Sequence, residues 1–167
     1  MRGEHGYVGG LPMFHMAAHP AWGFTYVGAT NVMIRAFEPR EVLESIERYR
    51  GTHVMLVPTM INLLLEHPAI DEVDLSSLEA VLYGGSPIAP EVLRRAVKRF
   101  GCGFGQTYGM TETSVATYLT PDDQDPDGKP HLLSSGGRAS ISQQVRVVDE
   151  HDVPLPPGGL GEIVVRG

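Results

Sequence analysis

Residues 105–113 carry a set of side chains that suits a nucleotide phosphate and its metal ion. The segment reads Gly-Gln-Thr-Tyr-Gly-Met-Thr-Glu-Thr and follows a short apolar run. A threonine hydroxyl can donate to a phosphate oxygen, and the Glu112 carboxylate suits Mg²⁺, which prefers hard oxygen ligands. The ring of Tyr108 could lie against a base. Alternatively, Thr111 to Thr113 begin a helix with an acid in its first turn, and both interpretations can hold because helix N-termini favour phosphate.

A second segment, residues 83–87, reads Tyr-Gly-Gly-Ser-Pro and joins a buried apolar run to a predicted helix. Ligands of parallel sheets bind beyond the carboxyl ends of the strands, and two glycines there let the backbone approach a flat ligand closely. The alternative is an ordinary tight turn. A hydrolase with Ser86 as nucleophile is disfavoured, because Ile88 stands where the Gly-x-Ser-x-Gly turn needs its second glycine.

The histidines, the single cysteine and a third glycine-rich segment carry weaker signals. His15 and His19 lie four residues apart and could be metal ligands on one helix face, but the sequence offers no third ligand at a metalloprotease spacing. Structural or pocket roles are therefore favoured for both. Cys102 lies in an apolar stretch, which favours a core thiol over a nucleophile. Residues 134–139 read as a flexible loop with one charge.

These segments need elements that hold them at one edge of a sheet. Residues 7–14 predict a strand that enters a turn at Pro12, and apolar runs predict further strands over residues 30–34, 54–57, 78–83 and 103–107. Helical spacing of apolar residues predicts helices that begin at Pro39, over residues 59–66 and over residues 90–100. Strands and helices that alternate in this order predict an α/β fold, a three-layer subdomain with a parallel sheet and helices on both faces.

The pattern changes after about residue 120. Residues 121–130 are charged and rich in turn formers, whereas residues 144–148 and 162–165 read as strands separated by a Pro-Pro-Gly-Gly turn. We therefore predict an α/β subdomain over residues 1–135 and the start of a β-rich subdomain over residues 136–167. The last strand is followed by no closing element, so we expect the chain to be an internal piece of a longer protein.

Composition excludes several classes of function. Hydrophobic residues make up 42% and charged residues 20% of the 167 residues, as in soluble globular proteins. The net charge of −7 offers no basic surface to nucleic acid. No apolar run reaches the roughly 20 residues of a membrane span. The single cysteine cannot form an internal disulfide, which favours the cytoplasm.

The segment Tyr-Gly-Met-Thr-Glu at residues 108–112 resembles the signature of the adenylate-forming superfamily: acyl- and aryl-CoA synthetases, firefly-type luciferases and peptide-synthetase adenylation domains. Other segments resemble further motifs of that family in the same order. They are residues 11–15 (Pro-aromatic-His), 57–59 (Val-Pro-Thr), 83–87 (the adenine-side loop), and 137–138, 145–149 and 161–167 (Gly-Arg, Val-Asp and Gly-Glu). The resemblance covers essentially the whole chain and indicates an acyl-CoA synthetase, within its large N-terminal domain.

The resemblance implies a two-step ligase reaction that uses ATP, Mg²⁺ and coenzyme A. A carboxylate attacks the α-phosphorus of ATP and gives an acyl-adenylate and pyrophosphate; the CoA thiol then attacks the acyl carbonyl, and AMP leaves. Thr111 and Glu112 are implied as catalytic residues, Thr111 at the α-phosphate and Glu112 on Mg²⁺. The implied acyl and CoA channel contains His15, Gly105 and Gly109. The implied nucleotide-binding residues are Gly84, Gly85, Ser86, Pro87, Gln106, Thr107, Tyr108, Gly109, Met110 and Thr111.

Departures from the family pattern limit what the chain alone can do. The family's phosphate loop, ribose-binding Asp and C-terminal lysine domain have no match here, and residues 128–130 (Gly-Lys-Pro) have the wrong order and position for that loop. We therefore expect the isolated chain to be inactive and to self-associate through uncovered faces. A noncatalytic nucleotide- or acyl-CoA-binding module is the alternative.

The expected substrate is a fatty or aryl carboxylic acid of unspecified length, in fatty acid metabolism or a related pathway. Residues 14–22 contain no acid that could pair with a substrate amino group. Because a buried ammonium without a partner is costly, an amino acid substrate is disfavoured.

Overall fold

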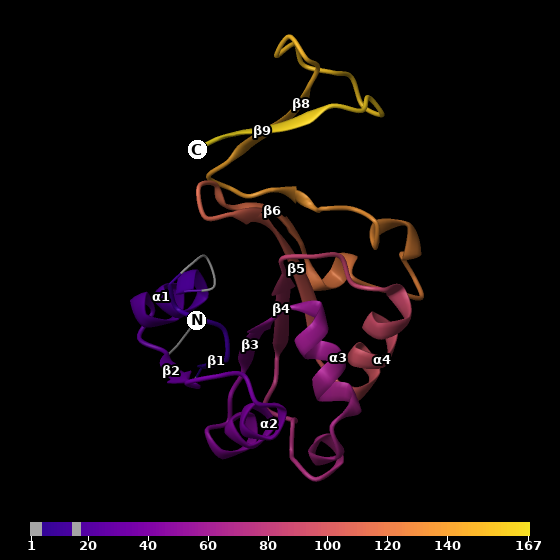
Figure 1. The fold of residues 1–167 in the computed structure, drawn as a ribbon. Helices are drawn as coiled ribbons and strands as arrows, with labels where there is room; N and C mark the ends of the chain where they lie inside the picture. Colours follow the sequence, from indigo (N-terminus) through magenta and orange to yellow (C-terminus); the bar gives the residue numbers. More distant parts are fainter. Residues whose placement is uncertain (1–4, 15–17) are drawn as a thin grey trace.

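The computed structural model of this protein describes residues 5–14 and 18–167. Within these residues the main feature is a seven-stranded sheet with the strand order β2-β1-β3-β4-β5-β6-β7 (Figure 1). The first five strands along this order are parallel to one another, and β6 is antiparallel to both of its neighbours, β5 and β7. The strands are β1 (Gly6–Gly9), β2 (Thr30–Met33), β3 (His53–Leu56), β4 (Ala80–Gly84), β5 (Gly103–Met110), β6 (Ser114–Leu119) and β7 (Arg138–Ala139).

Helices cover both faces of the sheet, so the predicted three-layer α/β arrangement is confirmed (Figure 1). The helices are α1 (His19–Tyr26), α2 (Pro39–Arg48), α3 (Pro58–Glu66) and α4 (Pro90–Phe100), with short 3₁₀ turns at Pro68–Asp71, Pro121–Asp123 and Pro130–Leu132. α2, α3 and α4 pack on one face against alternate strand residues such as Val54 and Val81. α1 packs on the other face, where Phe24 stacks on Tyr7.

The helices on the large core face begin and end at residues that the sequence marks. α2, α3 and α4 each have a proline in the first turn, where its missing N–H costs no hydrogen bond. α4 ends at Gly101, which adopts a left-handed conformation with φ of 67°. These boundaries agree with the predicted helices to within one to three residues.

The predictions for the first strand and for the region after β5 need correction. The first strand ends at Gly9, two residues earlier than the predicted turn at Pro12 implies, and residues 11–14 form the bend and turn that follow it. β5 runs on to Met110, and a turn at residues 111–113 leads directly into β6. The predicted helix start at Thr111 is therefore wrong, because the chain forms a β-hairpin there.

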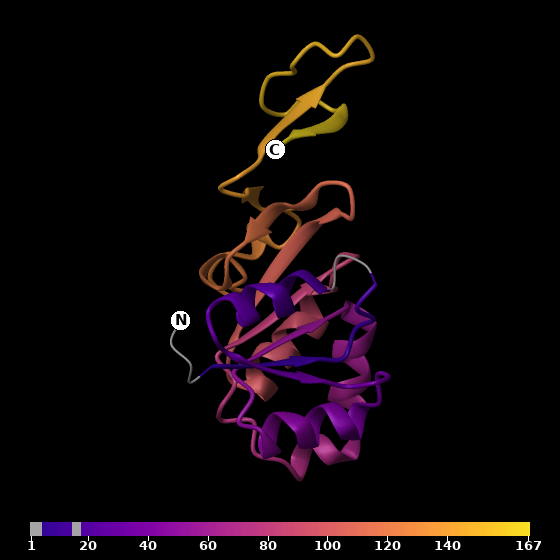
Figure 2. The same cartoon turned by 90° about the vertical axis from the view of Figure 1, so that its left-hand side faces the viewer.

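A separate hairpin follows the large sheet. β8 (Gln144–Val148) and β9 (Glu162–Arg166) pair only with each other within the described residues. Figures 1 and 2 show this hairpin projecting beyond the β6 side of the large sheet. Both strands were predicted. The predicted domain boundary at residue 135 stays a prediction, and β7 adds residues 138–139 to the large sheet.

No helix in the described ranges is both long and apolar enough to cross a membrane.

Candidate functional site

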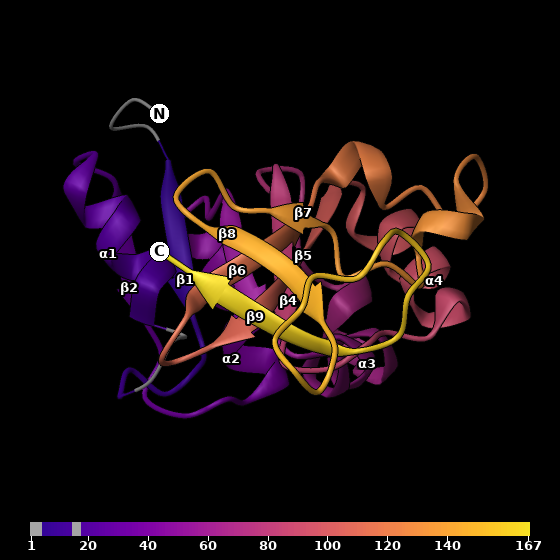
Figure 3. The same ribbon diagram turned by 90° about the horizontal axis from the view of Figure 1, so that it is seen from above.

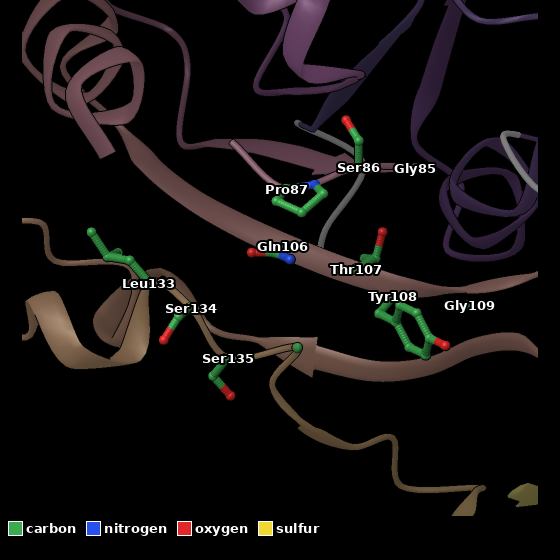
Figure 4. A pocket seen from close by; sticks show the side chains of 11 residues that line it. Gly85, Ser86, Pro87, Gln106, Thr107, Tyr108, Gly109, Leu133, Ser134 and Ser135 are labelled. Carbon is green, nitrogen blue, oxygen red and sulfur yellow. The ribbon is translucent and has the colours of Figure 1, made fainter. Parts of the chain in front are cut away.

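A cavity of about 320 Å³ lies beyond the carboxyl ends of β4 and β5. This is the edge at which parallel sheets bind ligands, and the volume falls within the usual range for small-molecule pockets. Figure 4 shows β5 between the loop that follows β4 and the loop that precedes β7. The lining residues are Gly85, Ser86, Pro87, Gln106, Thr107, Tyr108, Gly109, Leu133, Ser134, Ser135 and Gly136.

Residues from all three of the glycine-rich segments identified in the sequence line this cavity. Seven of the predicted nucleotide-binding residues line it, from Gly85 to Pro87 and from Gln106 to Gly109. Leu133 to Gly136 supply the opposite side, although the sequence indicated only a flexible loop there. The signal that could have found them is Gly137, whose φ of 92° and close approach to the Tyr118 backbone hold this loop against β6.

Gly84 has a packing role rather than a place in the cavity lining. A Cβ atom at Gly84 would lie 2.5 Å from Thr107 Oγ1 and 2.7 Å from the Thr107 carbonyl oxygen. The absence of a side chain therefore lets the end of β4 lie close to β5. Thr107 Oγ1 lies 3.3 Å from the Tyr83 carbonyl oxygen, to which it donates. Gly85 then turns the chain with φ of 85°, a conformation that favours glycine.

A polar network supports Gln106 beneath the cavity. The Tyr83 hydroxyl donates to Gln124 Oε1 at 2.6 Å and lies 3.1 Å from Gln106 Oε1. Gln124 Nε2 donates to Gln106 Oε1 at 3.4 Å. Tyr83 and Gln124 are almost fully buried, and burial raises the pKa of Tyr83. Sequence reasoning missed Gln124, because the turn-rich loop that contains it shows no motif.

Thr111 and Glu112 lie in the exposed turn between β5 and β6, directly after the cavity-lining end of β5. Neither residue lines the cavity, and neither does the exposed Met110. Among the described residues, the Glu112 carboxylate forms no hydrogen bond or ion pair. The turn itself is held by Thr113 Oγ1, which accepts from the Met110 N–H at 3.1 Å.

A second, mainly apolar cavity of about 290 Å³ lies between α1 and the sheet. It shares Thr107 with the first cavity, so the two are adjacent. Its lining residues are His19, Pro20, Gly23, Phe24, Met55, Leu82, Thr107 and Val115. His19 Nδ1 lies 3.0 Å from Ser114 Oγ, which connects α1 to the start of β6. Neither α1 nor this cavity was predicted, although a structural or pocket role was favoured for His19.

The predicted channel residues have different outcomes. His15 lies outside the described residues. Gly105 lies beneath the ring of Tyr118, where a Cβ atom would meet the tyrosine hydroxyl, and it lines neither of these two cavities. Gly109 lines the first cavity at the point where the pairing of β5 with β6 shifts.

Comparisons with known proteins agree with this geometry. The family model described as "AMP-binding enzyme" matches residues 1–167. A medium/long-chain-fatty-acid–CoA ligase of Mycobacterium tuberculosis is 41% identical over 157 residues, which are 93% of this chain and 27% of that protein. The chain thus spans less than a third of that relative's length.

Solved structures of similar proteins share the fold over the whole chain. An amide bond synthetase from Marinactinospora thermotolerans has a TM-score of 0.88 at 38% identity, over 99% of this chain and 33% of that one. The O-succinylbenzoate coenzyme A synthetase of Bacillus subtilis, solved with ATP and a magnesium ion, has a TM-score of 0.86 at 28% identity, over 100% of this chain and 34% of that one.

Proposed function

The chain belongs to the family of AMP-binding enzymes, and from this we propose that it forms the adenine and acyl side of the active site in an ATP-dependent acyl- or aryl-CoA synthetase. The observation that carries the proposal is that residues 85–87 and 106–109, which belong to the two signature segments, line one cavity. The similar synthetase from Bacillus subtilis was solved with ATP and magnesium, which supports a nucleotide as the ligand.

We place the adenine in the first cavity. Gly85 lets the loop after β4 approach a flat base closely, and Tyr108, which is 41% exposed, offers its ring from the end of β5. The hydrogen bond from Gln124, which Tyr83 holds in place, orients Gln106 at the cavity wall. A wall that is fixed in this way binds a base without a further cost of ordering the side chain.

The phosphates would then extend toward the turn between β5 and β6. The Thr111 hydroxyl would donate to the α-phosphate, and Glu112 would hold Mg²⁺. One exposed carboxylate fits this ion, because Mg²⁺ in such sites is held by one or two carboxylates together with substrate phosphates and water. When bound, Mg²⁺ supplies positive charge that offsets the charge of the triphosphate.

The second cavity fits the acyl group. Its lining is mainly apolar, it adjoins the first cavity at Thr107, and it lies between α1 and the sheet. A hydrophobic carboxylic acid bound there would place its carboxylate near Thr107, toward the nucleotide. Both fatty and aromatic acids remain candidates, and CoA would enter from the side of Gly109. A cytoplasmic location also stays part of the proposal.

The test is substrate-dependent pyrophosphate release by the complete enzyme that contains this segment. We expect release with ATP, Mg²⁺ and a hydrophobic acid, and thioester formation once CoA is added. Tyr108→Ala should raise the KM for ATP about 5- to 150-fold, since the loss of one stacked ring costs about 1–3 kcal/mol. Nucleotide binding without pyrophosphate release, across fatty and aryl acids, would instead identify a noncatalytic binding module.

A further inference from the structure

Two histidines and a glutamate lie close together at the amino ends of neighbouring strands, whereas the cavities lie toward the carboxyl ends. His5 precedes β1, His53 begins β3 and Glu79 precedes β4. These strands are neighbours in the sheet, and the parallel register aligns Tyr7 with His53 and His53 with Ala80. The topology therefore brings together three residues that are far apart in the sequence.

The separations suit a single metal ion. One ligand atom from each of the three side chains lies within 4.8 Å of the others, and His5 Nδ1 lies 3.4 Å from Glu79 Oε1. In a tetrahedral zinc site with bonds of about 2.0–2.2 Å, ligand atoms are about 3.3–3.5 Å apart. The pair of His5 and Glu79 already has this spacing, and the exposed Glu79 side chain is free to adjust its distance to His53.

The contact between His53 and Thr52 engages one ring nitrogen and leaves the other without a hydrogen bond in the described residues. Thr52 Oγ1 lies 3.1 Å from the Gly6 carbonyl oxygen, to which it donates its single proton. With that proton on Gly6, Thr52 Oγ1 accepts the proton of His53 Nδ1, which lies 2.9 Å away. The Nε2 lone pair of His53 is then available. A histidine that binds metal commonly donates its other ring N–H to an oxygen in this way.

His5 supplies a second available nitrogen. Its Nδ1 atom is shielded from solvent, meets no hydrogen-bond geometry within the described residues, and has Glu79 Oε1 3.4 Å away. A bound ion would satisfy both this nitrogen and the carboxylate. His5 and His53 are both half-buried, whereas Glu79 is exposed.

We propose that His5, His53 and Glu79 bind one Zn²⁺ ion, with water as the fourth ligand. Two imidazoles and one carboxylate suit Zn²⁺ and disfavour Mg²⁺, which prefers oxygen ligands only. The five residues of β4 lie between Glu79 and Gly85, and these six steps along an extended strand separate the two sites by roughly 20 Å. The ion is therefore distinct from any ion on the nucleotide. It ties the amino ends of β1, β3 and β4 together and stabilises the sheet.

The test is Zn²⁺ binding to the purified protein after treatment with a chelator. Calorimetry should give one site per chain, and Zn²⁺ but not Mg²⁺ should raise the melting temperature. Glu79→Gln and His53→Gln should each weaken Zn²⁺ binding at least about tenfold. His151→Gln is the matched control, because His151 also lies beside a glutamate, with its Nε2 3.8 Å from Glu150 Oε1. This variant should bind Zn²⁺ as the unaltered protein does.

The Glu79→Gln variant gives the decisive result. Because Glu79 is exposed, we expect this variant to fold even if His53→Gln does not. Unchanged Zn²⁺ affinity in Glu79→Gln would overturn the proposal. The absence of any Zn²⁺-dependent rise in the melting temperature of the unaltered protein would overturn it as well. Neither result depends on nucleotide binding, so the proposed synthetase function is tested separately.

Discussion

Glu112 is the residue on which the proposed phosphate chemistry most depends. Its position in an exposed hairpin turn, without a partner among the described residues, gives it no evident role in folding. In the complete enzyme we expect Glu112→Gln to lower pyrophosphate release at least about tenfold, because Mg²⁺ requires an anionic oxygen. The melting temperature should change little, and raised Mg²⁺ should restore part of the rate.

Glu150→Gln is the control for this experiment, since Glu150 is equally exposed but lies between β8 and β9. Its rate and its Mg²⁺ dependence should equal those of the unaltered enzyme. If Glu112→Gln also showed an unchanged rate and Mg²⁺ dependence, Glu112 would have no place in the active site.

Tyr83 tests the polar network that supports Gln106. Tyr83→Phe removes the donor to the buried Gln124 side chain, and we expect a loss of about 1–3 kcal/mol in the free energy of unfolding. Tyr118→Phe is the matched control, because the Tyr118 hydroxyl forms no hydrogen bond within the described residues; it should cost less than about 0.5 kcal/mol. Equal losses in urea titrations of the two variants would argue against a supporting role for the network.

Cys102 should be unreactive in the folded protein. Burial raises the pKa of its thiol to about 12, and only the thiolate attacks disulfide reagents. At pH 8 the thiolate fraction is then roughly a thousandfold below that of a free cysteine, whose pKa is about 8.5. We expect labelling by an aromatic disulfide to be at least about a hundredfold slower in buffer than in denaturant. Similar rates would show that the thiol is accessible.

At the scale of elements, Gly84 in β4 is needed for close packing of two strands, whereas Gly23 in α1 has open space around it. Gly84→Ala would place a Cβ atom 2.5 Å from Thr107 Oγ1, against both the side chain and the backbone of β5. We expect a loss of about 1–3 kcal/mol in the free energy of unfolding, together with weaker nucleotide binding. Gly23→Ala in α1 is the control, because no atom lies within 4 Å of the added Cβ atom.

The control should leave stability unchanged or raise it by up to about 1 kcal/mol, since alanine favours helices over glycine. Thermal denaturation of both variants measures the difference. A Gly84→Ala variant as stable as Gly23→Ala would mean that β4 and β5 can separate at this point without cost.

The elements that were predictable are those whose local signals agree with their packing. α4 has a proline at its start, apolar residues at helical spacing, and Gly101 at its end, and its boundaries were predicted to the residue. β3 and β4 are continuous apolar runs because both of their faces are covered. In such elements, local preference and tertiary burial lead to the same structure.

The elements that were missed lack one of these signals. α1 contains Gly23 and has no side-chain cap, and both of its long faces carry apolar residues, so helical spacing is weak. Thr111 to Ser114 carry the residue types of a helix start, yet pairing with β5 draws them into a hairpin. The metal-binding cluster shows no motif spacing, because its residues meet only through strand order.

At the scale of the whole molecule, the hairpin of β8 and β9 leaves an apolar face uncovered. The pairing sets Val147 opposite Ile163 and Val145 opposite Val165, so all four side chains lie on one face. None of the four is buried, and Ile163 is 47% exposed. Figure 3 shows the two strands side by side, and within the described residues neither pairs with any other strand. A two-stranded hairpin of this kind is marginally stable alone.

We therefore expect the isolated 167-residue chain to self-associate through this hairpin, since open strand edges and apolar faces promote pairing between copies. Light scattering should show a mass above the monomer at tens of micromolar and a fall toward the monomer on dilution.

Ile163→Lys should shift this equilibrium toward the monomer at least about tenfold, because a lysine on the apolar face opposes burial there. Val164→Lys is the control, because residue 164 alternates to the other face, opposite Arg146, and it should associate as the unaltered chain does. A clean monomer at high concentration would mean that the apolar face is tolerated in water, and equal effects of the two lysines would place the contact elsewhere on the molecule.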